Sequence, residues 1–73
     1  MLLRKRSFTL SGHRTSVALE PEFWAVLEAD AARARLSLAG YVAAVDRTRG
    51  GRPLASALRL RALDRARLPL PGA

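Results

Sequence analysis

The chain offers few side chains that could carry catalytic chemistry. His13 is its only histidine, it contains no cysteine, and six acidic residues beside one histidine are a poor basis for a metal centre. None of the motifs Gly-x-Ser-x-Gly, Walker A and His-Glu-x-x-His occurs, so a nucleophile and its base would have to be built around His13. Glu20 and Glu22 could be a catalytic carboxylate pair, but acidic residues are favoured in the first turn of a helix, and this explanation is strongly preferred. We predict that the protein is not an enzyme and uses no cofactor or metal.

The charged side chains point to a different kind of chemistry. Thirteen lysines and arginines against six acidic residues give a net charge of +7. Residues 1–19 carry four basic side chains and no acidic one, residues 20–46 carry two basic and five acidic, and residues 47–73 carry seven basic and one acidic. Two basic ends therefore flank an acidic middle, and such a balance predicts a polyanion as the partner.

A short strand is predicted over residues 14–19. Within it, the apolar Val17 and Leu19 alternate with smaller or polar residues, as a strand with one buried face requires. Residues 7–10 alternate too, but with the opposite parity, so Ser11-Gly12 must reset the phase as a bulge or as a turn. Both alternatives stay open, as does the question whether residues 7–10 form another strand.

Three helices should follow this strand. Glu20-Pro21 begins the first, which is predicted to end near Ala34. Ser37 is a natural N-cap for the second, which should end before Gly50. The third, residues 54–67, has apolar side chains at every fourth position but arginines on several faces, a pattern that fits a helix with two contact surfaces.

A lone strand in so small a chain favours assembly with a second copy. A domain of this size has a marginal core, and the edges of a single strand must be covered. Two strands related by a two-fold axis would form an antiparallel ribbon. Arg14, Ser16 and Ala18 would then project from a narrow basic face, which fits the major groove of DNA.

The same residues also resemble a known family. The order of strand, helix, serine-capped turn and helix resembles the ribbon-helix-helix (Arc/MetJ-type) family of DNA-binding proteins. A short bacterial subfamily marked by a Gly-His-Arg-Thr-Ser segment is more similar still, and the match covers roughly residues 6–67. The motifs that carry it are Gly12-His13-Arg14-Thr15-Ser16, Leu19-Glu20, Phe23-Trp24, Asp46-Arg47-Thr48-Arg49-Gly50 and Leu54-Ala55-Ser56-Ala57-Leu58-Arg59.

The resemblance implies a mainly α fold with one short β-strand. It would be an intertwined ribbon-helix-helix homodimer with a two-stranded antiparallel ribbon and a third, C-terminal helix. The expected parts are a basic N-terminal arm at 1–13, the ribbon-helix-helix core at 14–49, the C-terminal helix at 50–67 and a frayed tail at 68–73. The side chains expected in the dimer core are Val17, Leu19, Phe23, Trp24, Leu27, Tyr41, Val42 and Val45.

The resemblance also implies roles for particular residues. Those expected to read bases are Arg14, Ser16 and Ala18. Those expected to bind phosphate are Ser37, Leu38 and Ala39 at the start of the second helix. Separately from the resemblance, the position of Arg4, Lys5 and Arg6 beside the ribbon favours a phosphate-binding arm over a tail that only aids solubility. Many members have glycine two residues before the capping serine, where Arg35 stands, so this turn should be shaped differently or slightly strained.

These expectations combine into one function with two alternatives. The chain should be a sequence-specific transcriptional regulator that binds double-stranded DNA as a homodimer. One alternative is an antitoxin-type module whose residues 54–73 bind an acidic protein; the other is nonspecific binding of nucleic acid. No apolar run approaches the length needed to cross a membrane, and we expect a cytoplasmic location.

Overall fold

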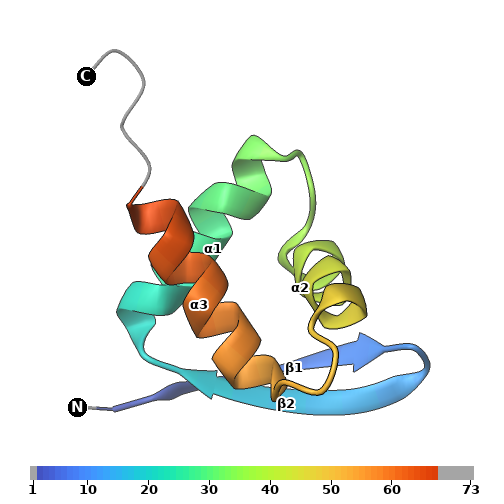
Figure 1. Ribbon diagram of the computed structural model, residues 1–73. Coiled ribbons are helices and arrows are strands. Elements are labelled where there is room, and N and C mark those ends of the chain that lie inside the picture. Colours follow the sequence, from blue (N-terminus) through green and yellow to red (C-terminus); the bar gives the residue numbers. More distant parts are fainter. Residues whose placement is uncertain (1, 68–73) are drawn as a thin grey trace.

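The computed structural model describes residues 2–67, and the predicted tail at 68–73 lies outside them. The described chain contains a hairpin followed by three helices (Figure 1). The elements in chain order are strand β1 (Arg4–Leu10), strand β2 (His13–Leu19), helix α1 (Pro21–Arg33), helix α2 (Leu38–Thr48) and helix α3 (Leu54–Ala66). The predicted two-stranded antiparallel ribbon and third helix are thus confirmed.

The second strand of the ribbon comes from the same chain, so the prediction of one strand per chain is wrong. β1 pairs antiparallel with β2 from Arg4 opposite Leu19 to Leu10 opposite His13. Ser11 and Gly12 join the strands with φ angles of 51° and 80°. Positive φ at both central residues is the geometry of a type I′ turn, whose twist matches that of the paired strands. The phase change between the two alternating segments is therefore a turn.

One face of the ribbon packs against the helices (Figure 1). Phe8 and Leu10 from β1 and Val17 and Leu19 from β2 are all buried there. Because successive strand residues point to opposite faces, the neighbours of these four side chains face away from the helices. The hairpin therefore separates an apolar inner face from a polar outer face.

The expected core residues come together within a single chain. Trp24, Leu19 and Leu27 are among the most deeply buried side chains, and Phe23 is half-buried beside them. The indole N–H of Trp24 donates to the carbonyl oxygen of Arg4 at 2.8 Å, which ties α1 to the beginning of β1. The remaining residues predicted for the core are buried as well: Val17, Tyr41, Val42 and Val45. These side chains pack together within one chain, and their predicted place in a dimer core stays a prediction.

The predicted helix boundaries are confirmed to within one or two residues. α1 begins at Pro21, which lacks the N–H that a first turn would leave unpaired. α2 has Ser37 as its N-cap, and the serine hydroxyl accepts from the backbone N–H of Gly40 at 3.0 Å. A Cβ on Gly40 would lie 3.2 Å from that hydroxyl oxygen, so glycine leaves room for the cap.

α3 is part of the core and contacts both α1 and α2. Leu54, Ala57, Leu58 and Ala62 are buried, and Leu58 is fully so. The prediction of a helix with two contact surfaces is confirmed; Figure 1 shows α3 crossing α1. No helix among residues 2–67 is both long and apolar enough to span a membrane.

Candidate nucleic-acid interface

The outer face of the ribbon carries six side chains in two rows. Strand alternation places Lys5, Ser7 and Thr9 of β1 beside Arg14, Ser16 and Ala18 of β2, on the face opposite the helices. All six are exposed except Ala18, which is half-buried. We call these six residues the ribbon face.

The ribbon face is organised as three cross-strand pairs. Lys5 lies opposite Ala18, Ser7 opposite Ser16, and Thr9 opposite Arg14. The hydroxyl oxygens of the central serines are 3.0 Å apart and share a hydrogen bond. Each pair therefore presents at least one hydrogen-bonding group or cation, and none contains an acidic residue.

Three of the six ribbon-face residues were predicted from the sequence to project outward. Arg14, Ser16 and Ala18 lie on the outer side as predicted, although their proposed contacts with bases stay predictions. Ser7 and Thr9 were missed because residues 7–10 were not assigned to a strand. The signal was present, since Ser7 and Thr9 alternate with apolar residues and Ser11-Gly12 suits a tight turn.

The three basic residues expected in an arm are separated by the strand that contains them. Only Lys5 lies on the ribbon face. The Arg6 guanidinium lies on the inner side, 5.0 Å from the Trp24 ring centre, and its Nη2 is 3.1 Å from Oε1 of Glu28. Arg4 shares the parity of Arg6, and its carbonyl accepts from Trp24. Arg6 is thus engaged within the chain, and the three residues do not form one flexible arm.

The start of α2 supplies the second predicted site. Ser37 and Ala39 are exposed and Leu38 is half-buried. The first backbone N–H groups of a helix lack intrahelical acceptors and favour anions, so this turn can bind a phosphate. That role stays a prediction for all three residues.

The turn before α2 is strained at Arg35, as expected for a residue that stands where many family members have glycine. Its φ is 59°, the left-handed conformation that usually favours glycine. Its N–H donates to Ala32 at 3.0 Å, and the N–H of Leu36 donates to Ala31 at 2.9 Å, the two bonds of a Schellman motif. The exposed Arg35 side chain therefore lies two residues before Ser37, at the cost of local backbone strain.

Most of the acidic side chains form ion pairs within the chain. Glu20 pairs with Arg59, Glu28 with Arg6, Asp30 with Arg33 and Arg65, and Asp46 with Arg49. Within residues 2–67, eight basic side chains lack such a partner: Arg4, Lys5, Arg14, Arg35, Arg47, Arg52, Arg61 and Arg67. The excess positive charge thus lies partly on the ribbon face and in the turn before α2.

A family model described as a ribbon-helix-helix domain matches residues 3–66. The chain belongs to this family. Ribbon-helix-helix domains are generally DNA-binding regulators, they are typically not enzymes, and they typically form dimers. The comparisons with curated proteins and with solved structures found no match.

In this ribbon-helix-helix domain, a polar cluster at Asp30 joins all three helices. The Tyr41 hydroxyl of α2 donates to the Asp30 carboxylate of α1, and Arg65 Nε of α3 lies 3.2 Å from Oδ2 of Asp30. Burial raises the pKa of Asp30, but the Tyr41 hydrogen bond and the neighbouring arginines together outweigh it, and the pKa is lowered. Burial, followed by the hydrogen bond to Asp30 and its charge, raises the pKa of Tyr41 to about 12. The cluster therefore favours an ionised Asp30 and a neutral Tyr41.

A second ion pair fixes the start of α1 against α3. Arg59 Nε lies 3.1 Å from Oε1 of Glu20, and the Arg59 guanidinium lies 6.0 Å from the Phe23 ring centre. A backbone hydrogen bond at Glu20 lowers its pKa, burial opposes this, and Arg59 lowers the pKa further. Arg59 and Arg65 therefore lie beside acidic residues at the start of α1 and on α1, although the sequence did not distinguish them from the other arginines of α3.

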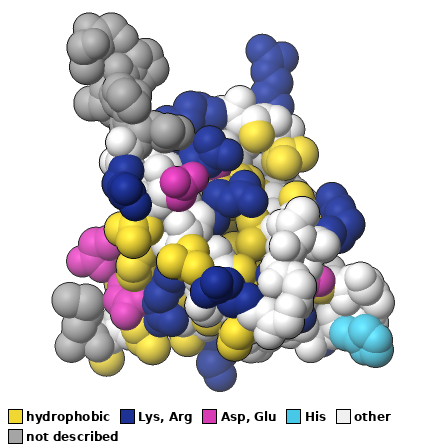
Figure 2. Space-filling model, in the orientation of Figure 1, with side chains coloured by type: hydrophobic (Ala, Val, Ile, Leu, Met, Phe, Trp, Pro, Cys, Tyr) yellow, Lys and Arg dark blue, Asp and Glu magenta, His cyan; other side chains and the backbone are white. Residues whose placement is uncertain are grey.

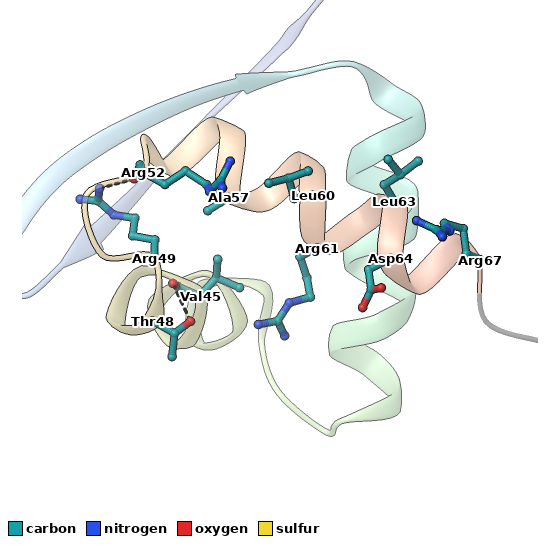
Figure 3. Close-up of a pocket in the computed structure, with 10 residues that line it drawn as sticks. All are labelled: Val45, Thr48, Arg49, Arg52, Ala57, Leu60, Arg61, Leu63, Asp64 and Arg67. Atoms are coloured by element: carbon teal, nitrogen blue, oxygen red, sulfur yellow. Dashed lines mark hydrogen bonds between the residues drawn. The ribbon is translucent and has the colours of Figure 1, made fainter.

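An open groove of about 420 Å³ runs between the end of α2 and the outer side of α3. Figure 3 shows Arg49 and Arg52 at one end of it and Arg67 at the other. Leu60 and Leu63 line it and are about half exposed. Lys and Arg side chains are interspersed with hydrophobic ones on the face that carries α3 (Figure 2). No strand residue lines this groove, so it is distinct from the ribbon face.

Among residues 2–67, no group of three or more histidine, cysteine, aspartate or glutamate side chains is placed to hold a metal ion.

Proposed function

We propose that this ribbon-helix-helix domain is a sequence-specific transcriptional regulator that inserts its ribbon face into the DNA major groove. The observation that carries the proposal is the composition of that face: two cations, three hydroxyls and one methyl group on a two-stranded ribbon with no acidic residue. The major groove is wide enough for such a ribbon, and it presents a distinct pattern of donors and acceptors for each base pair.

The individual side chains suit base edges. Arg14 can donate two hydrogen bonds to guanine, and Lys5 can also donate to guanine. Ser7, Ser16 and Thr9 can donate or accept, and the Ala18 methyl can contact the methyl of thymine. The shared hydrogen bond between the two serines holds their hydroxyls at the centre of the face. Sequence discrimination is therefore expected mainly from the two cations at the ends.

Phosphate contacts would set the register of the ribbon on DNA. We assign them to the backbone N–H groups at Ser37, Leu38 and Ala39, helped by the charge of Arg35. Arg35 lacks an acidic partner among the described residues, so its charge is available to a phosphate. Arg6 is left out of this set because Glu28 and Trp24 already engage it.

We further propose that the working form is a homodimer in which each chain contributes a complete hairpin. Support comes from the dimers that are typical of the family and from the small size of the chain. The short bacterial subfamily with the Gly12-His13-Arg14-Thr15-Ser16 segment remains our assignment within that family.

The antitoxin-type alternative is less favoured. It would suit a C-terminal segment that becomes ordered on an acidic partner protein, but α3 already buries Leu54, Leu58 and Ala62 against the rest of the chain. A partner at residues 54–66 would have to bind the outer side of α3, where Leu60 and Leu63 are exposed. Nonspecific binding of nucleic acid would need only the charge and not the ordered pairs of the ribbon face.

Selection of bound sequences from random DNA, followed by mobility-shift titration, tests the proposal. A preferred sequence should bind about 10³-fold or more tightly than random DNA at the same salt concentration. Arg14→Ala should reduce this ratio, whereas Arg47→Ala, which changes an exposed α2 arginine outside the ribbon face, should retain it. Equal affinity for selected and random DNA would favour the nonspecific alternative.

A further inference from the structure

We infer that a cavity between the end of α1, α2 and α3 binds a small carboxylate whose body is apolar. The cavity has a volume of about 380 Å³, within the range of about 300–1,000 Å³ that is typical of ligand sites. Its lining comes from the three helices and from the turn between α1 and α2. The site is therefore distinct from the ribbon face.

The cavity carries an excess of positive charge. Among the described residues that line it, Arg33, Arg61 and Arg65 are basic and Asp30 is acidic. Three positive charges and one negative charge leave an excess of +2 around the cavity. An anionic ligand is therefore attracted, whereas a cationic one is repelled.

The Asp30 carboxylate already has partners within the chain. It accepts from the Tyr41 hydroxyl, and its oxygens lie 3.4 Å from Nη2 of Arg33 and 3.2 Å from Nε of Arg65. The carbonyl oxygens at the end of α1 likewise accept from backbone N–H groups of the following turn. The negative groups beside the cavity are thus compensated, and the excess positive charge is available to a ligand.

Arg61 supplies the charge that has no partner. Within residues 2–67 it forms no ion pair with an acidic side chain. Figure 3 shows its guanidinium extending from α3 toward the segment that joins α1 and α2. Burial and then Asp30 raise the pKa of Tyr41, and the charge of Arg61 opposes them. The Arg61 charge therefore acts on the same cavity that Tyr41 lines.

Arg65 supplies further donors from the same side of α3. It lies four residues after Arg61, so the two side chains project from one face of the helix. Its Nε is buried and makes no hydrogen bond within residues 2–67, although Oδ2 of Asp30 lies 3.2 Å away. A guanidinium has five N–H donors, and two neighbouring guanidinium groups can hold one carboxylate through several charge-assisted hydrogen bonds.

Most of the remaining lining residues are apolar. They are Ala34, Leu36, Ala44 and Val45. Leu36 is 45% exposed, so covering its side chain with an apolar group would be favourable. A bare inorganic anion would leave these side chains in contact with water. The cavity therefore favours a carboxylate that carries an aliphatic or aromatic body.

A ligand in this cavity would lie beside the proposed phosphate contacts. Leu36 stands between the strained Arg35 and the capping Ser37, in the turn before α2. A carboxylate bound next to this turn lowers its positive potential, so DNA affinity should fall. This consequence rests on the proposed function, whereas the ligand site itself does not.

Calorimetric titration with octanoate tests the site, with acetate, inorganic phosphate and octanol as matched probes. Octanoate combines an anion with an apolar body, and each of the other probes lacks one of these parts. We expect saturable binding of octanoate to one site per chain, and binding at least about 100-fold weaker for the other three probes. Equal binding of octanol, or equal binding of phosphate, would overturn the inference.

Substitutions of the lining separate the site from attraction by net charge. Arg61→Gln should weaken octanoate binding by roughly 10- to 150-fold, because a charge-assisted hydrogen bond is lost. Arg47→Gln removes the same charge from an exposed position of α2 outside the lining and should leave the affinity nearly unchanged. Ala44→Leu reduces the cavity volume without a change of charge and should also weaken binding. Equal weakening by Arg61→Gln and Arg47→Gln, in variants that circular dichroism shows to be folded, would overturn the inference.

Two aromatic side chains report where the ligand binds. Tyr41 and His13 are the only residues of their types, so each gives its own aromatic NMR signals. Tyr41 lines the cavity, whereas His13 begins β2. Octanoate should shift the Tyr41 signals and leave those of His13 in place. The opposite pattern would locate the ligand elsewhere and overturn the inference.

Mobility-shift titration in the presence of octanoate separates the site from its consequence. Saturating octanoate should lower the DNA affinity of the wild-type chain severalfold and have little effect on Arg61→Gln. An unchanged DNA affinity with octanoate bound would overturn the coupling to DNA. A chain that binds octanoate but no DNA would overturn the proposed function and support the ligand site.

Discussion

The ribbon face and the helical layer, which consists of α1, α2 and α3, use basic side chains in opposite ways. In the helical layer, Arg59 and Arg65 lie against Glu20 and Asp30, and their charge is balanced within the chain. On the ribbon face, Arg14 has no acidic partner among the described residues. The same residue type thus contributes to packing in one region and remains available to a polyanion in the other.

The acidic middle of the chain explains this division. Glu20 and Asp30 pair with arginines from the C-terminal helix, and Glu28 pairs with Arg6 from the N-terminal strand. The acidic segment therefore balances basic residues from both ends that the fold brings onto the helices. Net charge alone could not distinguish these residues from the arginines that lack an acidic partner among residues 2–67.

Leu58→Ala should have the largest effect on stability. Leu58 is fully buried, so truncation should lower the free energy of unfolding by about 2–5 kcal/mol. Urea denaturation monitored by the fluorescence of Trp24 would measure this loss. Leu60→Ala, at a position 46% exposed on the same helix, should change stability by less than about 1 kcal/mol. Equal effects of the two variants would contradict the placement of α3 in the core.

The pH dependence of stability should report the Asp30 cluster of the helical layer. The pKa of Tyr41 is raised to about 12, so the stability it contributes is complete below pH 10 and is lost as the pH rises toward 12. The pKa of Asp30 is lowered, so its contribution is present above about pH 4 and is lost as the pH falls. Tyr41 is the only tyrosine, and tyrosinate absorbance would follow its ionisation directly.

Tyr41→Phe is the matched variant for this measurement. Loss of the hydroxyl should cost about 1 kcal/mol at neutral pH and remove the alkaline decline between pH 10 and pH 12. An unchanged alkaline decline in this variant would show that another group causes it.

Arg35→Gly should separate stability from DNA binding. Glycine removes the steric strain at φ 59°, so the free energy of unfolding should rise by about 1 kcal/mol. The loss of a cation beside the start of α2 should weaken binding to all DNA sequences. It should also reduce the slope of log affinity against log salt concentration by about 1. A variant that is stabilised but has an unchanged salt slope would exclude a phosphate contact of Arg35.

The smallest effect on stability comes from a matched pair of arginine substitutions. Arg59→Gln removes a partly exposed ion pair and should cost at most about 1 kcal/mol, with little change in DNA affinity. Arg14→Gln should leave the free energy of unfolding within about 0.5 kcal/mol and reduce binding to the preferred DNA sequence. Denaturation and mobility-shift titrations on both variants would test whether paired and unpaired arginines serve separate roles.

Much of the fold followed from local sequence signals. Pro21 after Glu20, Ser37 and Gly50 marked the helix ends because the unpaired groups of a helix terminus favour particular residue types. The alternation in residues 14–19 likewise identified the outward positions of β2, since successive strand side chains point to opposite faces. These patterns arise from neighbouring residues and need no knowledge of the tertiary contacts.

The source of the second strand, by contrast, was decided by tertiary structure. An alternating strand is compatible with a partner from the same chain or from another copy, because both satisfy the same backbone hydrogen bonds. The Ser11-Gly12 turn and the common burial of Phe8 and Val17 select the first arrangement. The pairing of Arg6 with Glu28 was equally hidden, because such a contact depends on how distant elements approach in space. By itself, the sequence determined the local elements and the total charge; packing of those elements decided which charges were neutralised and which remained on the ribbon face.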